Sequence, residues 1–135
     1  MVWTQGVAVP LAFLLASSAA TEPGLGPWSH TRPITISLSN FAYTPSTVML
    51  ERDVPYVLHF TNMASGGHDF VANTFFARAR IMPADEAKVS DGEVELRRGE
   101  SMDVHLIAPV AGTYRVHCTH FMHSMLGMNG KIVVQ

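Results

Sequence analysis

The chain has 135 residues, of which 47% are hydrophobic and 15% are charged, and its formal net charge is -2. This length is enough for one hydrophobic core and too short for two typical domains. The nine Lys and Arg residues are scattered apart from the pair Arg97 and Arg98. The sequence therefore contains no basic stripe that could follow a phosphate backbone, and we expect no nucleic-acid partner.

Residues 1–20 are predicted to be a signal peptide that directs the protein to the periplasm or otherwise out of the cell. An apolar run over residues 6–16 is followed by small residues, and Ser18-x-Ala20 suits a cleavage site. The run is shorter than the ~20 residues of a membrane-spanning helix, so we expect no span in the mature chain. Residues 1–5 contain no Lys or Arg, which leaves an uncleaved anchor or a wrongly assigned start as alternatives.

Residues 21–33 are predicted to form an N-terminal arm or linker, because they are rich in Gly, Pro and Ser and have no periodic apolar pattern. From residue 34 onward, apolar and polar residues alternate in short runs separated by Gly and Pro turns, which predicts a single all-β domain over residues 34–135. Such spacing is typical of an antiparallel sandwich or barrel. The predicted strands are 34–38, 48–50, 56–61, 93–96, 102–107, 113–118 and 131–134, with short helical turns near 75–79 and 83–87.

The same alternation sorts the histidines from the core. His59, His105 and His117 fall on the outer faces of their strands, and His30 falls in the arm, so we expect these four to have no functional role. Cys118 falls on the inner face of its strand. The cysteine is therefore delivered to the core of the domain.

Cys118 is the only cysteine, although an exported protein would normally be expected to carry disulfides. A free thiol would be liable to oxidation, an intermolecular disulfide would make a dimer, and a metal would hold the sulfur as a thiolate. The residues around it favour the metal. His123 and Met128 follow in HCTHFMHSMLGMNG, and thiolate, imidazole and thioether are the ligands that copper selects.

A redox-active copper site needs a second imidazole, and His68 is the best candidate because Gly66 and Gly67 before it permit a sharp backbone path. Within the loop, His120 and Met125 compete with His123 and Met128 on chemistry alone. Spacing favours the latter pair, because a histidine so close to Cys118 cannot easily share its metal. Zinc is the rival metal, but structural zinc prefers more Cys or His ligands and has no use for a thioether.

The order His68, then Cys118-x4-His123-x4-Met128, followed by Gly130 and a last apolar strand, resembles the cupredoxins, the small blue copper proteins. The loop spacing is most similar to that of rusticyanin and the phytocyanins, and the segments 41–45, 60–62 and 109–114 are also similar to the family's framework. The resemblance covers residues 34–135. It implies a Greek-key sandwich with one copper per chain, cycling between Cu(I) and Cu(II).

The resemblance also implies roles for the ligands and for one neighbour. His68, Cys118 and His123 would be the equatorial ligands, and Met128 the axial one. Many relatives have Asn after the first histidine, where this chain has Asp69. We expect the Asp69 carboxylate to bond toward Thr119 and tie the two ligand loops together, although its charge could instead lower the reduction potential.

The leading functional hypothesis is an exported one-electron carrier that meets a transient redox partner as a monomer. We expect no enzyme activity, because protein groups would fill all four coordination positions. The alternative is a copper chaperone or buffer that delivers Cu(I) to a copper-accepting protein through the Met- and His-rich loop. A third reading is an adhesion domain without metal, since sandwich folds host unrelated functions.

The apolar side chains of the loop have two possible roles. Phe121, Met122, Met125 and Leu126 could fill the end of the sandwich, as Met and Phe commonly do. Alternatively, they could form an apolar collar around the edge of His123, where a partner would dock over a small interface.

Overall fold

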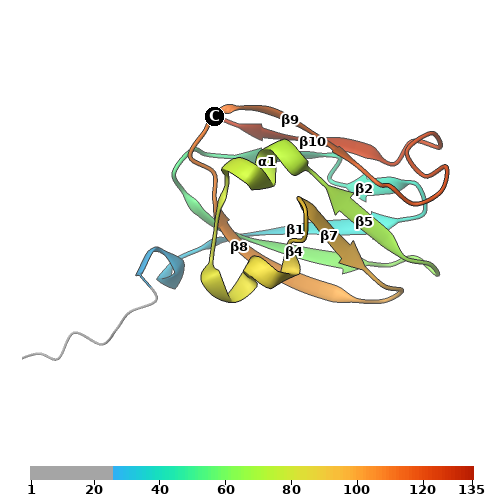
Figure 1. Cartoon of the computed structure of the whole chain (residues 1–135), viewed down its shortest axis with the longest axis horizontal. Coiled ribbons are helices and arrows are strands. Elements are labelled where there is room, and N and C mark those ends of the chain that lie inside the picture. The colour runs from blue at the N-terminus through green and yellow to red at the C-terminus, as the bar shows by residue number, and fades with distance from the viewer. Residues whose placement is uncertain (1–25) are drawn as a thin grey trace, which may run out of the picture.

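The computed structural model describes residues 26–135, and the predicted signal peptide lies outside these residues. The chain folds into two five-stranded sheets that pack face to face (Figure 1). One sheet has the strand order β2-β1-β4-β8-β6 and the other β3-β10-β9-β5-β7. The elements are η1 (Gly26–Ser29), β1 (Arg32–Ser39), β2 (Ala42–Thr44), β3 (Thr47–Leu50), β4 (Pro55–Asn62), β5 (His68–Val71), α1 (Asn73–Arg78), β6 (Arg80–Ile81), η2 (Pro83–Lys88), β7 (Glu93–Leu96), β8 (Ser101–Ile107), β9 (Gly112–His117) and β10 (Asn129–Val134).

The all-β sandwich expected from the sequence is confirmed, and so are the short helical turns, which appear as α1 and η2. The seven predicted strands appear as β1, β3, β4, β7, β8, β9 and β10. Two features differ from expectation. The pairs β1–β4 and β3–β10 are parallel rather than antiparallel, and β2, β5 and β6 were not foreseen.

Strand β5 could not be predicted from the alternation of apolar and polar residues. All four of its residues are buried, so it has no alternation of apolar and polar side chains. A strand covered on both faces lacks the pattern by which half-buried strands are recognised. His68 was expected in a loop and is instead the first residue of this strand.

The core lies between the two sheets and follows the alternation of the sequence. In β4 every second side chain is buried, with Leu58 and Phe60 fully so. Phe70 from β5 packs against Phe60 from the opposite sheet, with ring centroids 5.0 Å apart. Burying large apolar side chains of this kind is the main favourable term in folding.

Three of the four histidines expected to have no functional role lie on the outer faces of their strands, and the fourth, His30, precedes β1. His59 pairs with Asp103 at 2.5 Å, and the Nδ1 atom of His105 lies 2.7 Å from the buried carboxylate of Asp85. His117 is half-buried and His30 is exposed. None of the four lies in the cluster around Cys118.

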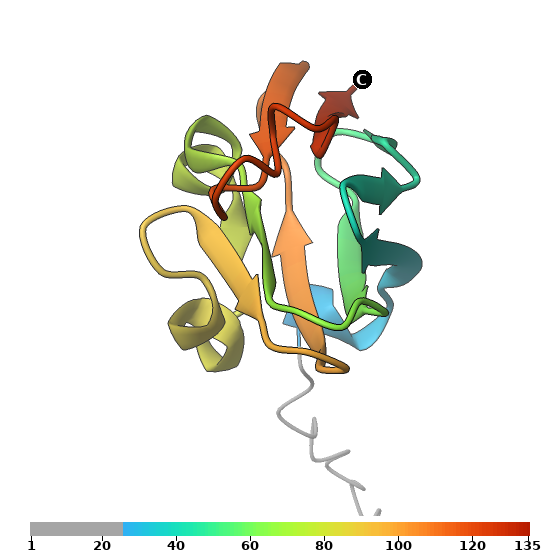
Figure 2. The same ribbon diagram turned by 90° about the vertical axis from the view of Figure 1, so that its right-hand side faces the viewer.

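Strand order in the second sheet decides which loops meet. β9 lies between β10 and β5, so the chain segment leaving β9 comes close to the start of β5 and to the start of β10. Val71 and Asn129 both pair with His117, the residue before the cysteine. Figure 2 looks onto this end of the sandwich, where the β9–β10 loop joins two neighbouring strands of one sheet. Among the described residues, no helix has the length and apolar character needed to cross a membrane.

Candidate metal centre

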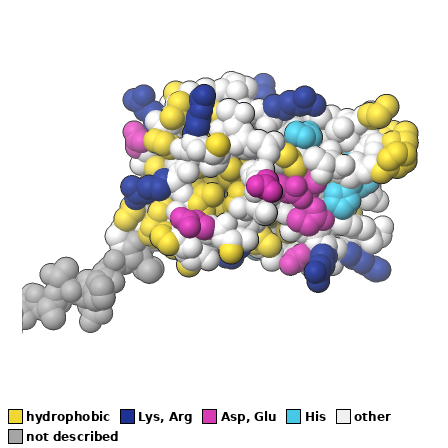
Figure 3. Space-filling view, viewed as in Figure 1, with side chains coloured by type: hydrophobic (Ala, Val, Ile, Leu, Met, Phe, Trp, Pro, Cys, Tyr) yellow, Lys and Arg dark blue, Asp and Glu magenta, His cyan; other side chains and the backbone are white. Residues whose placement is uncertain are grey.

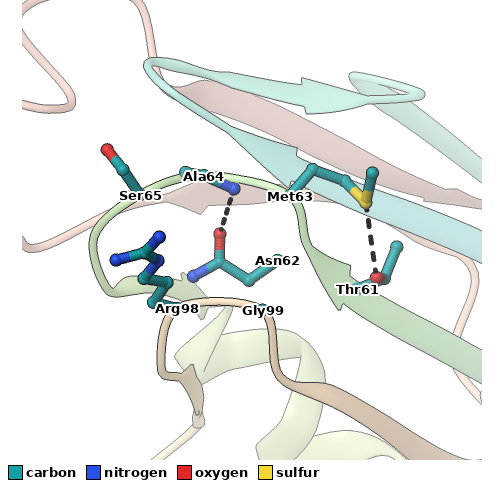
Figure 4. Close-up of a pocket in the computed structure, with 7 residues that line it drawn as sticks. All are labelled: Thr61, Asn62, Met63, Ala64, Ser65, Arg98 and Gly99. Atoms are coloured by element: carbon teal, nitrogen blue, oxygen red, sulfur yellow. Dashed lines mark hydrogen bonds between the residues drawn. The ribbon is translucent and has the colours of Figure 1, made fainter.

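His68 is held at its position by a well-ordered approach from β4. The amide of the buried Asn62 donates hydrogen bonds to the carbonyls of Gly66 at 2.8 Å and of Leu96 at 3.1 Å, and its oxygen accepts one from Ala64 N at 3.0 Å. Figure 4 shows Asn62 beneath this loop, in an open pocket whose lining contains no Cys or His. The Gly-rich turn is therefore a fixed support for the histidine and not a free loop.

Three side chains converge at the end of the sandwich. The Cys118 sulfur lies 3.4 Å from Nδ1 of His123 and 3.9 Å from Nδ1 of His68. His68 and Cys118 are buried and His123 is half-buried. Their ligand atoms all lie within 4.8 Å of one another, close enough to share one ion.

Met128 lies in the same loop and is fully buried. Backbone hydrogen bonds close the loop around the site, because Met128 O accepts from Cys118 N at 3.2 Å and Met128 N donates to His123 O at 3.0 Å. Met128 is thus tied through its backbone to both loop residues of the cluster.

The two competing loop residues have other surroundings. His120 directs Nε2 to the carboxylate of Glu95 at 3.0 Å, and the Met125 side chain is 81% exposed. The structure therefore brings His123, and not His120, to the cysteine.

Burial controls the protonation of the cluster. Desolvation raises the pKa of the Cys118 thiol to about 11. Burial, followed by the nearby His123 and His120, lowers the pKa of His68. At neutral pH, His68 is therefore a neutral ligand, whereas the thiol has to release its proton before a metal can bind.

The carboxylate of Asp69 forms the predicted link between the ligand loops. It accepts a hydrogen bond from Thr119 N at 2.7 Å and a second, short one from the Thr119 hydroxyl. Asp69 follows His68 and Thr119 follows Cys118, so the two bonds join the residues next to two members of the cluster.

Two further polar residues support the cluster and escaped the sequence reasoning. Nε2 of His68 lies 3.3 Å from Oδ1 of Asn40, where its N–H can donate and leave Nδ1 free for a metal. The buried Tyr43 hydroxyl donates to the carbonyl of Asp69 at 2.7 Å. Both come from the β1–β2 hairpin. Tyr43 lies in the segment 41–45 that resembles the family's framework, but the sequence assigns neither residue its partner, because the partners are distant along the chain.

This donor set fits copper. One thiolate, two imidazole Nδ1 atoms and a buried thioether in the same loop are the soft and borderline donors of a blue copper site. The hydrogen bond between Nε2 of His68 and Oδ1 of Asn40 would orient the imidazole ring without any rearrangement.

Solved structures with this fold include blue copper proteins. Auracyanin from Roseiflexus castenholzii, solved after dithionite reduction, is 22% identical with a TM-score of 0.58, covering 78% of this chain and 98% of that one. Auracyanin A from Chloroflexus aurantiacus is 20% identical with a TM-score of 0.53, covering 76% of this chain and 99% of that one.

The fold also occurs in an enzyme. A blue copper oxidase from Nitrosomonas europaea is 17% identical with a TM-score of 0.59, and the similarity covers 78% of this chain and 39% of that one. At these identities the likeness concerns the fold alone. No curated protein matches the chain significantly. The model of the cupredoxin-like domain family matches residues 7–134, and on this evidence the chain belongs to that family.

Proposed function

We propose that the protein is a one-electron carrier that binds one copper ion through His68, Cys118, His123 and Met128. The observation that carries the proposal is the buried Cys118 sulfur with two imidazole Nδ1 atoms at 3.4 Å and 3.9 Å. Membership of the cupredoxin-like family and the fold shared with auracyanins support it.

The protein's part in this function is to hold its ligands still. Copper would supply the one-electron change between Cu(I) and Cu(II). His68 is fixed by Asn40, and the chain around Cys118 is fixed by the Asp69–Thr119 bonds. A site whose ligands do not move between the two oxidation states needs little reorganisation, which favours rapid electron transfer.

Electrons would pass through the half-buried His123, whose ring meets the edge of Phe41 at a centroid distance of 5.2 Å. An apolar collar surrounds this end, and Figure 3 shows hydrophobic side chains gathered at the end that carries the β9–β10 loop. The collar consists of Phe41 (38% exposed), Phe121 (88%), Met122 (44%), Met125 (81%) and Leu126 (53%). Exposed apolar patches of this kind suit transient docking of a redox partner.

The visible spectrum of the copper-loaded chain tests the centre. We expect an intense thiolate-to-copper charge-transfer band that is absent from Cys118→Ser and retained in His30→Ala, whose histidine is exposed in the arm. A colourless Cu(II)-loaded wild-type chain would overturn the proposal.

Electron self-exchange between reduced and oxidised copies tests the collar without a known partner. Phe121→Asp and Met125→Asp should slow self-exchange with an unchanged spectrum. Met49→Ala, which removes a 48% exposed methionine on β3, should leave the rate unchanged. Equal rates in all variants would remove the case for docking here.

Copper delivery is a second candidate, favoured by the exposed thioethers of Met122 and Met125. Thioethers bind Cu(I) well. A carrier of electrons should retain its copper against a Cu(I) chelator, whereas a carrier of metal should exchange it quickly or bind more than one Cu(I) per chain.

We further propose that residues 1–20 direct export and that the mature chain is a monomer. We also propose that it has no enzyme activity, because protein groups would occupy every coordination position of the copper. Mass spectrometry of the protein secreted by a bacterial host should give a chain that begins at Thr21. An intact N-terminus in the exported fraction would contradict cleavage.

A further inference from the structure

A second group of ligand atoms lies beside the cluster around Cys118 and takes no part in it. It consists of a carboxylate oxygen from Asp69, one from Glu95 and an imidazole nitrogen from His120, all within 4.8 Å of one another. Nε2 of His120 is 3.0 Å from one Glu95 oxygen and 3.2 Å from the other.

We propose that Asp69, Glu95 and His120 form a second metal site that binds a borderline divalent cation, Zn²⁺. Two carboxylate oxygens and one imidazole nitrogen are the donors that Zn²⁺ accepts. Water would complete the coordination, because the side chains of Glu95 and His120 are 46% and 33% exposed.

Strand pairing places like charges together in a way that a cation would relieve. Asp69 in β5 lies directly opposite Glu95 in β7 in the antiparallel register. Like charges in directly opposite positions destabilise a sheet. Within residues 26–135, no Lys or Arg forms an ion pair with either carboxylate, and His120 is the one ion-pair partner of Glu95.

A third carboxylate adds to the negative potential. Glu93 lies on the same strand as Glu95, and its pKa is raised by burial and then by the nearby Asp69 and Glu95. Figure 3 shows acidic side chains gathered beside histidine on the face over β5 and β7. This face of the sheet therefore concentrates negative charge, and none of its three carboxylates forms an ion pair with a Lys or Arg of residues 26–135.

The ligand atoms keep free lone pairs for a cation. Gly67 lies against the pair, and a Cβ built there would meet His120 Cε1 at 3.1 Å and Glu95 Oε1 at 3.4 Å, so a larger residue would press on both side chains. Asp69 bonds Thr119, but each ionised carboxylate oxygen has a second lone pair. The site needs no rearrangement of the Asp69–Thr119 link.

The second site adjoins the first. The ring of His120 stacks on that of His123, with centroids 5.5 Å apart and an interplanar angle of 19°, and Asp69 is the chain neighbour of His68. A divalent cation held there would disfavour the more positive Cu(II) state by simple Coulomb repulsion. Zinc should therefore raise the reduction potential of the copper.

Calorimetric titration of the Cu(I)-loaded full chain with Zn²⁺ tests the site. We expect one Zn²⁺ per wild-type chain. In Glu95→Gln and in His120→Gln the affinity for Zn²⁺ should be lower by about 10-fold to 100-fold or more, because losing a residue that merely contacts a ligand already lowers metal affinity by this much. Glu86→Gln and His30→Ala remove an exposed carboxylate and an exposed histidine elsewhere and should bind Zn²⁺ as the wild type does.

Absence of zinc binding in the wild type, or equal affinity in Glu95→Gln, would overturn the proposal and leave His120 and Glu95 as a surface ion pair. Only the shift in reduction potential rests on the proposed copper function. If the chain does not bind copper, the zinc affinities with and without Glu95→Gln are compared in the Cys118→Ser chain, where zinc cannot use the cysteine sulfur, so the two failures are distinguishable.

Discussion

At the scale of single residues, Met128 is the proposed ligand whose replacement should change the reduction potential of the copper without removing the copper. The side chain is fully buried, and its backbone holds the loop. In Met128→Leu we expect copper to be retained and the reduction potential to rise, because a weak donor that favours Cu(II) is lost. Cyclic voltammetry measures the change, and Met125→Leu, at an exposed position, should leave the potential unchanged.

Asp69 should contribute to stability through the hydrogen bonds that it accepts. Asp69→Ala leaves the N–H and hydroxyl of Thr119 without these partners, whereas Asp69→Asn keeps an acceptor oxygen. We expect the alanine variant to be less stable than the asparagine variant by about 1–3 kcal/mol in urea unfolding of the metal-free chain. Equal unfolding free energies of the two variants would show that the Asp69–Thr119 hydrogen bonds do not contribute to stability.

The sequence predicted the Asp69–Thr119 bond, because each residue follows a proposed ligand and both ligands had to meet at one ion. It could not predict Asn40 as the partner of His68 Nε2. The side chain of Asn40 reaches the histidine only through the pairing of β1 with β4 and the packing of the two sheets. No spacing along the chain records that approach.

At the scale of elements, the close contact of β10 with the segment before β3 depends on a residue without a side chain. A Cβ at Gly130 would lie 2.6 Å from the carbonyl oxygen of Ser46, which is backbone and cannot swing away. Gly130→Ala should therefore lower the free energy of unfolding by about 1–3 kcal/mol through backbone displacement.

Gly66→Ala is the matched control for this variant. A Cβ at Gly66 meets nothing within 4 Å, so thermal unfolding should show little change. A Gly130→Ala chain that unfolds at the temperature of the Gly66→Ala chain would contradict the steric explanation.

Asp85 attaches η2 to the outer face of β8. Its buried carboxylate accepts from Lys88 Nζ at 2.6 Å, from His105 N at 2.8 Å and from His105 Nδ1 at 2.7 Å. Burial alone would raise the pKa of Asp85, but the hydrogen bonds from Lys88 and His105 outweigh it and lower the pKa below its ordinary value of 3.8. The stabilisation is therefore present above the pKa of the unfolded carboxyl and is lost as pH falls through the folded value.

Asp85→Asn should lower the free energy of unfolding by about 1–3 kcal/mol at neutral pH, with a smaller difference from the wild type as the pH falls below 3.8. Urea unfolding across this range measures both effects, and Glu86→Gln, which removes an exposed neighbouring carboxylate, is the control. A difference from wild type that stays constant with pH would contradict the account.

At the scale of the whole molecule, the closed sandwich makes the metal-free chain sensitive to alkali. Burial raises the pKa of Cys118 from 9.0 to about 11 and raises the pKa of Tyr43 as well. The folded chain holds these protons more tightly than the unfolded chain, so stability is full below the unfolded values and declines as pH rises above about 9. Urea unfolding of the metal-free chain between pH 8 and about 10.5 should show the decline.

Cys118→Ser removes one of these two groups and should show a shallower decline than the wild type. Identical pH profiles for the two chains would exclude the cysteine as a source of the effect.

The sequence by itself determined the ligand loop and most of the sheet. Cys118, His123 and Met128 lie within one loop, so their spacing alone restricts what they can share, and period-two alternation records which face of a strand is buried. Alternation says nothing of which strand lies beside which, and so the parallel pairs β1–β4 and β3–β10 were missed.

Only the tertiary structure decided which side chains from distant parts of the chain meet. The order β10-β9-β5-β7 brings His68 to the cysteine, turns His120 toward Glu95 and sets Glu95 opposite Asp69. These residues are far apart along the chain, and their approach depends on hydrogen bonding between strands and on burial of a common core. Local sequence carries the chemistry of each side chain, whereas the fold chooses the partners.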